Sequence, residues 1–350
     1  MNLMINFKID YAVGAHPNIL KCLYETNLLH TAGYGEDPFC QEAIECLRQR
    51  LEALESDIHF LVGETQTNLT FISHTLKSYE AVLSATTGHI AFNETGAIEV
   101  TGHKVITLPS RNGKVTLEQL KQTFTAHHGV HMVKPKLLYL SNPTELGTLY
   151  SKEELITLST FCKEHNLYLY IDGARLGSAL VSSTNTISLA DYAKLTDAFY
   201  IGGTKNGALF GEALVINHTQ LKEDFRLSMK QHGALLAKGR LLGIQFLELF
   251  KDNLYYTLAA HANTMANLLQ EGLKSLNIPF FVETTTNQLF PIFSYLLIDD
   301  LSSHFSFQIW GGYDQHHAIV RLVTSFTTSQ QDVHDFLCAV STFMNKATSS

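Results

Sequence analysis

Apolar and polar positions alternate along the middle of the chain with two different periods. Short apolar runs are typical of buried strands, and longer segments with apolar residues three or four positions apart are typical of helices. The predicted strands cover residues 59–62, 81–86, 104–108, 136–141, 167–172, 197–201 and 211–216, with helices between them at 63–79, 116–125 and 152–166. Strands that alternate with helices favour an α/β fold with a mainly parallel sheet.

The pattern changes toward both ends of the chain. Residues 1–41 are interrupted by glycine and proline and precede a helical segment at 42–56. After about residue 243 the sequence predicts a long helix, two strands and a last helix, at 253–275, 290–297, 318–323 and 330–345. We therefore predict an N-terminal segment (1–45), a large domain (46–245) and a small α+β C-terminal domain (246–350). A chain of 350 residues with 45% hydrophobic content can bury the core that this division requires.

Composition and charge exclude several kinds of partner. The net charge is −8 and lysine and arginine form no run, so neither nucleic acid nor an anionic membrane is expected to bind. No run of about 18 apolar residues predicts a membrane span, and no signal peptide is recognised. Five cysteines without CxxC spacing argue against a disulfide framework and favour a reducing cytoplasm. His127, His128 and His131 lie in a glycine-containing loop without an acidic residue at ligand spacing, so no metal is predicted.

One lysine and one aspartate indicate covalent chemistry. Lys205 stands in a glycine-rich connection between two apolar strands, where a partly desolvated amine can form a Schiff base with a carbonyl compound. A lone turn lysine is usually solvated, so the interpretation depends on Asp172, which ends the preceding apolar strand. Carboxylates at such strand ends face the ligand crevice of open α/β sheets. An aspartate for the ring nitrogen and a lysine for the aldehyde are what pyridoxal 5′-phosphate requires.

Four motifs carry a resemblance to a known family. In chain order they are Gly88-His-Ile-Ala-Phe-Asn-Glu-Thr-Gly-Ala97, Asn142-Pro-Thr-Glu-Leu-Gly-Thr-Leu-Tyr150, Asp172-Gly-Ala-Arg175 and Gly202-Gly-Thr-Lys205. Together they resemble the threonine aldolase and β-eliminating lyase family, and the likeness extends from Asp10 to about Thr324. The resemblance implies the aspartate aminotransferase type of fold, pyridoxal 5′-phosphate as cofactor, and a homodimer or homotetramer.

The cofactor's phosphate is expected where a strand turns into a helix, at Gly63, Glu64 and Thr65. Free backbone N–H groups and the helix dipole favour an anion there. The family has a small residue where Glu64 stands, so we expect its carboxylate to point away from the phosphate and Thr65 to bind it. Thr204 is a second candidate hydroxyl. By resemblance, His89 stacks on the cofactor ring and is a candidate base for a substrate hydroxyl.

The substrate is expected to be a small amino acid held by arginine. Arg175, which the motif also places at the cofactor, and Arg321 can each bind a carboxylate through two parallel hydrogen bonds. The alternative for Arg321 is an edge-strand arginine whose head group reaches solvent. Asp10 matches a family residue near the substrate, although Ile9 stands where the family has serine. Tyr34 resembles a loop residue that enters the neighbouring subunit's site.

The preferred reaction is an aldol cleavage. The chain is predicted to split the Cα–Cβ bond of a β-hydroxy-α-amino acid of the threonine or allo-threonine type into glycine and an aldehyde, with Lys205, Asp172 and His89 as catalytic residues. A β-eliminating lyase or an aminotransferase acting on another amino acid is the nearest alternative. A relative that binds cofactor without turnover is a third, and the joint retention of Lys205, Asp172, His89 and Arg175 argues against it.

Overall fold

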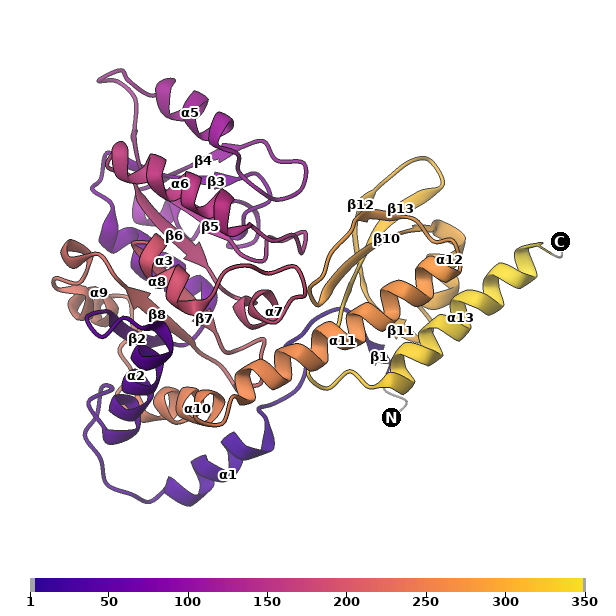
Figure 1. Cartoon of the computed structure of the whole chain (residues 1–350), viewed down its shortest axis with the longest axis horizontal. Coiled ribbons are helices and arrows are strands. Elements are labelled where there is room, and N and C mark those ends of the chain that lie inside the picture. The colour runs from indigo at the N-terminus through magenta and orange to yellow at the C-terminus, as the bar shows by residue number, and fades with distance from the viewer. Residues whose placement is uncertain (1–3, 349–350) are drawn as a thin grey trace.

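The computed structural model describes residues 4–348 and has a large and a small lobe (Figure 1). A seven-stranded sheet forms the centre of the large lobe, in the order β2-β8-β7-β6-β5-β3-β4. Its strands are β2 (Asp57–Leu61), β3 (Glu80–Ala85), β4 (Lys104–Leu108), β5 (Lys134–Ser141), β6 (Tyr168–Asp172), β7 (Ala198–Gly202) and β8 (Glu212–Ile216). β8 pairs antiparallel with β2 and β7, and the other pairs are parallel. The predicted mainly parallel α/β sheet is confirmed.

Three helices of the large lobe, α5, α6 and α8, begin with a capping box. Thr116, Ser151 and Ser188 each form a capping box, in which the hydroxyl accepts an N–H three residues on and the side chain there accepts the cap's own N–H. The helices of this lobe are α1 (Pro17–Thr26), α2 (Pro38–Leu51), α3 (Glu64–Thr75), α4 (His89–Phe92), α5 (Leu117–Thr125), α6 (Lys152–Glu164), α7 (Leu176–Leu180), α8 (Leu189–Leu195), α9 (Phe225–Gln231) and α10 (Arg240–Lys251), with 3₁₀ turns at Glu99–Thr101 and Thr219–Leu221. Predicted and observed bounds of α5 and α6 agree within two residues.

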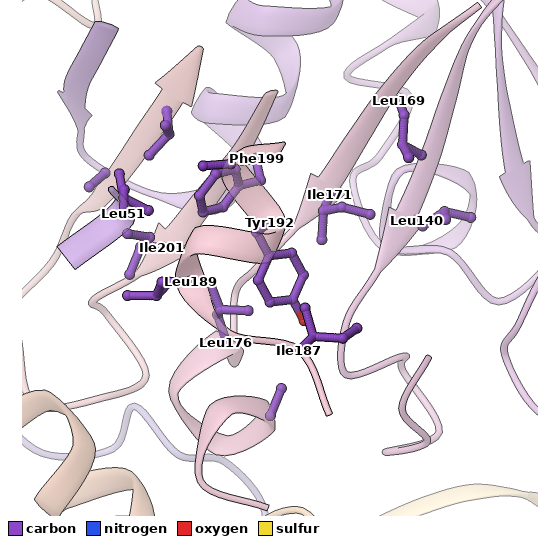
Figure 2. Close-up of a cluster of buried hydrophobic side chains, with 14 of the residues drawn as sticks. Leu51, Leu140, Leu169, Ile171, Leu176, Ile187, Leu189, Tyr192, Phe199 and Ile201 are labelled. Atoms are coloured by element: carbon purple, nitrogen blue, oxygen red, sulfur yellow. The ribbon is translucent and has the colours of Figure 1, made fainter. Parts of the chain in front are cut away.

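The core between sheet and helices is apolar and continuous. Figure 2 shows the ring of Tyr192, from α8, among Ile171 of β6, Phe199 of β7 and Leu189. All four are buried, and burying an aromatic or branched side chain contributes about 1.5–3 kcal/mol each. This core holds β6 and β7 together, and these are the strands that lead to Asp172 and Lys205.

The N-terminal segment contributes to both lobes. β1 (Ile5–Asn6) pairs in parallel with β11 (Phe305–Ser306) in the small lobe, whereas α1 and α2 cover the large lobe. The region expected to be loop-rich thus contains a ten-residue helix, α1. Pro17 and Pro38, read as interruptions, stand in the first turns of α1 and α2. Proline is favoured there because its missing N–H would have had no helical partner.

The small lobe is an antiparallel sheet packed against helices. Its order is β12-β13-β10-β9, from β9 (Phe280–Val282), β10 (Gln288–Ser294), β12 (Gln308–Gly312) and β13 (His317–Val323), and its helices are α11 (Leu254–Ser275), α12 (Tyr295–Leu301) and α13 (Gln330–Thr348). In Figure 1 α11 runs from α10 to the small lobe. β12, β9 and α12 were not predicted from the sequence, whereas α11 was predicted within one residue. Within residues 4–348 no helix is both long and apolar enough to span a bilayer.

Candidate active site

The order of the strands fixes where a ligand can bind. The chain passes from β3 to β4 on one side and returns to β5 on the other side of β3. Ligands of open α/β sheets bind beyond the carboxyl ends of the strands at such a switch point. His89 follows β3, Glu145 follows β5, Asp172 ends β6 and Lys205 follows β7. Four neighbouring parallel strands therefore deliver four titratable side chains to one edge of the sheet.

A cavity of about 620 Å³ opens at this edge, between the two lobes. The large lobe contributes Lys205, His89, Glu145 and Arg175 to its wall, and the small lobe contributes Arg321, Trp310, Gln288 and Gln308. A narrower extension is lined by Asp172, Glu64 and Tyr200 and shares Lys205, His89, Glu145 and Arg175 with the cavity. The structure thus brings together residues that the sequence predicted from five separate segments.

Lys205 is nearly buried and ion-paired. Its side chain is 8% exposed, and Nζ lies 2.9 Å from Oε1 of Glu64, the first residue of α3. The carboxylate of Glu64, which was expected to point away from the phosphate, turns toward the lysine. No side chain caps α3 at Gly63, and Thr65 is exposed beside it. A Cβ added to Gly63 would meet nothing within 4 Å, so there is open space beside the residue that precedes α3.

The turn that carries Lys205 is held by a buried acid. Glu212 accepts hydrogen bonds from the Gly203 N–H (3.1 Å) and from Thr204 Oγ1 (2.6 Å). Burial, aided by the charge of Glu64, raises the pKa of Glu212 well above its usual value. Thr204 Oγ1 also accepts the Gly211 N–H at 3.0 Å. The Thr204 hydroxyl, a candidate for binding the phosphate, therefore already stabilises the turn and donates its proton to Glu212.

Asp172 is an anion enclosed by hydrogen-bond donors. Tyr139 and Tyr200 each donate a hydroxyl to it at 2.5 Å, the Asn68 amide donates at 3.2 Å, and the Ala174 N–H donates at 3.0 Å. Burial alone would raise the pKa of Asp172, but the positive charge of His89 and these hydrogen bonds hold it below its usual value. The carboxylate is therefore charged although it is buried. The two tyrosines were not predicted from the sequence, because only the paired strands bring them to Asp172.

His89 lies between two glutamates. Its Nδ1 is 2.7 Å from Glu94 Oε1, and its backbone N–H donates to Glu145 Oε1 at 2.8 Å. Burial would lower the pKa of His89, but the hydrogen bond to Glu94 and the charge of Asp172 raise it above its usual value. Burial raises the pKa of Glu145 to about 7. Glu145 was missed as a site residue, although it stands within the Asn142–Tyr150 motif just after a strand end.

The two arginines differ in their partners. Arg175 makes two hydrogen bonds to Asp10, at 2.7 and 3.0 Å, and Asn287 donates to the same carboxylate at 2.9 Å. Asp10 is buried, and both of its oxygens are taken, so it holds Arg175. Within residues 4–348 no carboxylate lies within 4 Å of Arg321, and its buried Nε has no hydrogen-bond partner. Burial and the nearby Arg175 lower the pKa of Arg321 to about 10. Its guanidinium lies 5.4 Å from the ring centre of Trp310.

Tyr34 lies outside this cavity within one chain. It lines a different pocket, with Arg226 and Leu236, and Lys230 Nζ lies 4.8 Å from its ring centre. The ring is 44% exposed. The structure of one chain therefore does not bring Tyr34 to Lys205.

Known proteins resemble this chain along most of its length. The sequence profile of the β-eliminating lyase family matches residues 17–294. The low specificity L-threonine aldolase of Pseudomonas sp. (strain NCIMB 10558) is 32% identical over 265 residues, which are 75% of this chain and 76% of that protein. The corresponding enzyme of Pseudomonas aeruginosa is 31% identical over 76% of this chain and 77% of that protein.

A solved structure agrees over nearly the whole molecule. Leishmania major threonine aldolase superposes with a TM-score of 0.96 at 46% identity, covering 97% of this chain and 99% of that one. Aspartate aminotransferase of Thermus thermophilus superposes with a TM-score of 0.71 at 14% identity, covering 97% and 91% of the two chains. The second likeness shows the fold alone, and it is the fold that the sequence predicted.

Proposed function

Because the chain belongs to the β-eliminating lyase family, we propose that it is a pyridoxal 5′-phosphate-dependent aldolase. The proposed reaction splits a β-hydroxy-α-amino acid of the threonine type into glycine and an aldehyde. Relatives at 31%, 32% and 46% identity that carry the name threonine aldolase support it. The observation that carries it is one cavity lined both by a nearly buried amine, Lys205, and by Arg321, a cation without an anionic partner among residues 4–348.

The side chains present fit the proposed cofactor. Asp172 is a buried anion suited to a protonated ring nitrogen, and Lys205 is an amine at the same cavity edge. The uncapped first turn of α3 begins beside open space, as a phosphate requires. When bound, the cofactor would supply a ring system that can accept the electron pair left on Cα. The negative charge of Asp172 favours that acceptance because it stabilises the protonated ring nitrogen.

The remaining residues orient the substrate. Arg321 offers a fork of N–H donors to the α-carboxylate, and Gln288, whose buried Oε1 has no hydrogen-bond partner among the described residues, lines the same cavity. Arg175 is neutralised by Asp10 and contributes hydrogen bonds more than net charge. Holding the carboxylate fixes which Cα bond stands perpendicular to the cofactor ring, and this selects the bond that breaks.

Removing the positive charge of Arg321 is expected to weaken substrate binding. In Arg321→Gln, KM should rise about 10–100-fold, the equivalent of the roughly 1.5–3 kcal/mol of a hydrogen bond to a charged group. The fall in kcat should be smaller. Arg111→Gln is a matched control, because Arg111 is exposed and lies outside the cavity. Steady-state kinetics decide the matter: an unchanged KM in Arg321→Gln would exclude this arginine as the carboxylate anchor.

The proposed enzyme works as a homodimer or homotetramer in the cytoplasm. Exposed apolar side chains on α1 and the segment after it, at Tyr24, Leu28 and Leu29, support an interface. The exposed ring of Tyr34 is consistent with a residue that reaches a neighbouring subunit. Light scattering tests this assembly, and a molar mass equal to that of one chain, 39.1 kDa, would rule it out.

A panel of amino acids tests the proposed reaction. The purified protein, loaded with pyridoxal 5′-phosphate, is incubated with β-hydroxy-α-amino acids of both configurations at Cβ. Glycine and an aldehyde in equal amounts are the expected products. A keto acid with ammonia would instead indicate β-elimination, and transfer of the amino group to an added keto acid would indicate an aminotransferase. Failure to turn over any member of the panel would refute the aldolase proposal.

A further inference from the structure

We propose that Glu145 accepts the proton of the substrate's β-hydroxyl group, so that Glu145, and not His89, is the base of the cleavage. This inference rests on the proposed function. It assigns a catalytic residue that the sequence motifs did not single out. Three observations support it: the position of Glu145, the hydrogen bonds of its carboxylate, and the contacts that fix the loop after β5.

The position of Glu145 is suited to a substrate-facing base. Glu145 follows β5 at the switch point of the sheet and lines both the main cavity and its narrow extension, as Lys205 does. Its Oε1 accepts two hydrogen bonds, from Ser141 Oγ at 2.6 Å and from the His89 N–H at 2.8 Å. No hydrogen bond to Oε2 is found among residues 4–348. One oxygen is therefore anchored while the other is available to a ligand.

His89 is less suited to take the same proton. Its Nδ1 is engaged with Glu94 at 2.7 Å, and Glu94 Oε1 is held in turn by the Asn68 amide at 2.8 Å. This pairing raises the pKa of His89 and favours a protonated ring, which has no lone pair to offer. The raised pKa of Glu145, about 7, makes its carboxylate a stronger base than an ordinary one while leaving it ionised above neutrality.

The loop that carries Glu145 is fixed from both lobes. Asn142 donates to the Tyr192 hydroxyl at 2.5 Å, and its Oδ1 accepts the Tyr150 N–H at 3.1 Å. From the small lobe, Thr286 Oγ1 donates to the Gly147 carbonyl at 3.0 Å. Gly147 has φ +72°, and an added Cβ would lie 2.9 Å from Thr284 Cγ2. A carboxylate held in this way can accept a proton without first moving.

The proposed step is balanced. The O–H bond of the β-hydroxyl breaks as an O–H bond forms on Glu145. The electron pair of that O–H bond stays on the substrate oxygen and forms the second bond between this oxygen and Cβ. The Cβ fragment then leaves as the aldehyde. The pair of the broken Cα–Cβ bond remains on the Cα side, and Cα then receives a proton from Lys205 to give glycine. Glu145 returns its proton to solvent and Lys205 regains one from solvent, so no further reactant is needed.

Glu145→Gln should separate two reactions of the loaded enzyme. Cleavage of the best substrate of the panel should fall about 10²-fold in kcat, within the range of general base catalysis. Exchange of the glycine Cα proton with deuterium, followed by NMR, uses the same cofactor and Lys205 but no hydroxyl, and should keep its wild-type rate. Retained exchange also establishes that the variant is folded and loaded. Glu145→Asp should recover part of the cleavage rate, because it keeps a carboxylate.

The pH dependence gives a second readout. Below about pH 7 Glu145 gains a proton and can no longer accept one, so wild-type cleavage should fall tenfold per unit as pH decreases. Other charged groups around this region are Glu64 on α3, His89 and Glu94 after β3, Asp172, Arg175, Lys205 and Arg321. Glycine exchange depends on these other groups but not on Glu145. A loss of rate at low pH is therefore assigned to Glu145 if it is seen for wild-type cleavage, is not seen for exchange, and is no longer seen for cleavage by Glu145→Gln.

Two outcomes would overturn the inference. Cleavage at the wild-type rate in Glu145→Gln would show that another group takes the proton. Equal losses of cleavage and exchange would show that Glu145 maintains the site as a whole. Both differ from a failure of the proposed function, in which the wild-type protein itself releases no glycine from any β-hydroxy amino acid.

Discussion

Turnover is expected to disappear in Lys205→Ala. The amine is the group that would hold the cofactor covalently and return a proton to Cα, so kcat should fall by about 10⁴-fold or more, the upper range for a positioned proton-transfer group. Lys205 is nearly buried and paired with Glu64, and its loss leaves that carboxylate without a cation. Activity on the panel substrate measures the first effect. Borohydride reduction followed by intact-mass measurement should find cofactor attached to the wild-type chain and none on the variant.

Lys194→Ala is the control for this experiment. Lys194 pairs with Glu52 at 3.1 Å on the exposed surface, far from the cavity lining. Its removal should leave both activity and cofactor attachment unchanged. Attachment of cofactor to Lys205→Ala after reduction, at one equivalent per chain, would contradict the assignment and would require another lysine as the anchor.

The second large effect is expected in Asp172→Asn. An asparagine keeps the size of the side chain but removes the negative charge that would stabilise a protonated ring nitrogen, so kcat should fall about 10²–10³-fold. KM should change less, because no substrate group is expected to touch Asp172. In the variant the amide NH₂ group replaces one of the two oxygens that accept the hydroxyl protons of Tyr139 and Tyr200. One of these hydroxyl groups then loses its acceptor, which should lower the free energy of unfolding by about 1–3 kcal/mol. Kinetics and denaturant unfolding measure the two effects separately.

The same substitution at a second strand-end aspartate is the control for this experiment. Asp197 precedes β7 at the opposite edge of the sheet and accepts the Leu169 N–H at 2.7 Å. Asp197→Asn also removes the charge of a partly buried strand-end aspartate, keeps an oxygen that can accept the Leu169 N–H, and should leave kcat unchanged. Should Asp172→Asn keep wild-type kcat, the charge at this position would have no part in the reaction.

Elements defined by local patterns could be predicted from the sequence. The strands before Asp172 and Lys205 are short apolar runs with abrupt polar ends, and both were found within one residue of their expected places. The helix α1 was missed because Pro17 was read as a break when it begins the helix. β9 has three residues, too few for a period to be recognised, and β12 has only two apolar residues and ends in two glycines.

Site residues were predictable where a motif holds them, and their partners were not. Asp10 and Arg175 were both expected at the substrate, yet their ion pair joins positions 165 residues apart in the chain, and no local pattern reports such a contact. Glu64 was expected to turn away from the phosphate, and its contact with Lys205, which was not predicted, depends on how α3 faces the turn after β7. The raised pKa of Glu145 arises from burial, which only the assembled lobes create. Tyr34 at a neighbouring subunit's site stays a prediction.

The hydrogen bonds around Arg175 also determine how the two lobes are joined. Asp10 holds Arg175 and is held by Asn287 at the start of the small-lobe sheet. The Asn287 N–H donates to Ser178 on α7, and Ser178 donates to Asn263 on α11, at 3.1 and 2.6 Å. Contacts between domains of one chain commonly permit hinge motion. Here a change in the angle between the lobes would strain the hydrogen bonds that link Asn287, Asp10 and Arg175. Because Arg175 lines the cavity, the angle between the lobes and the orientation of this guanidinium are mechanically coupled.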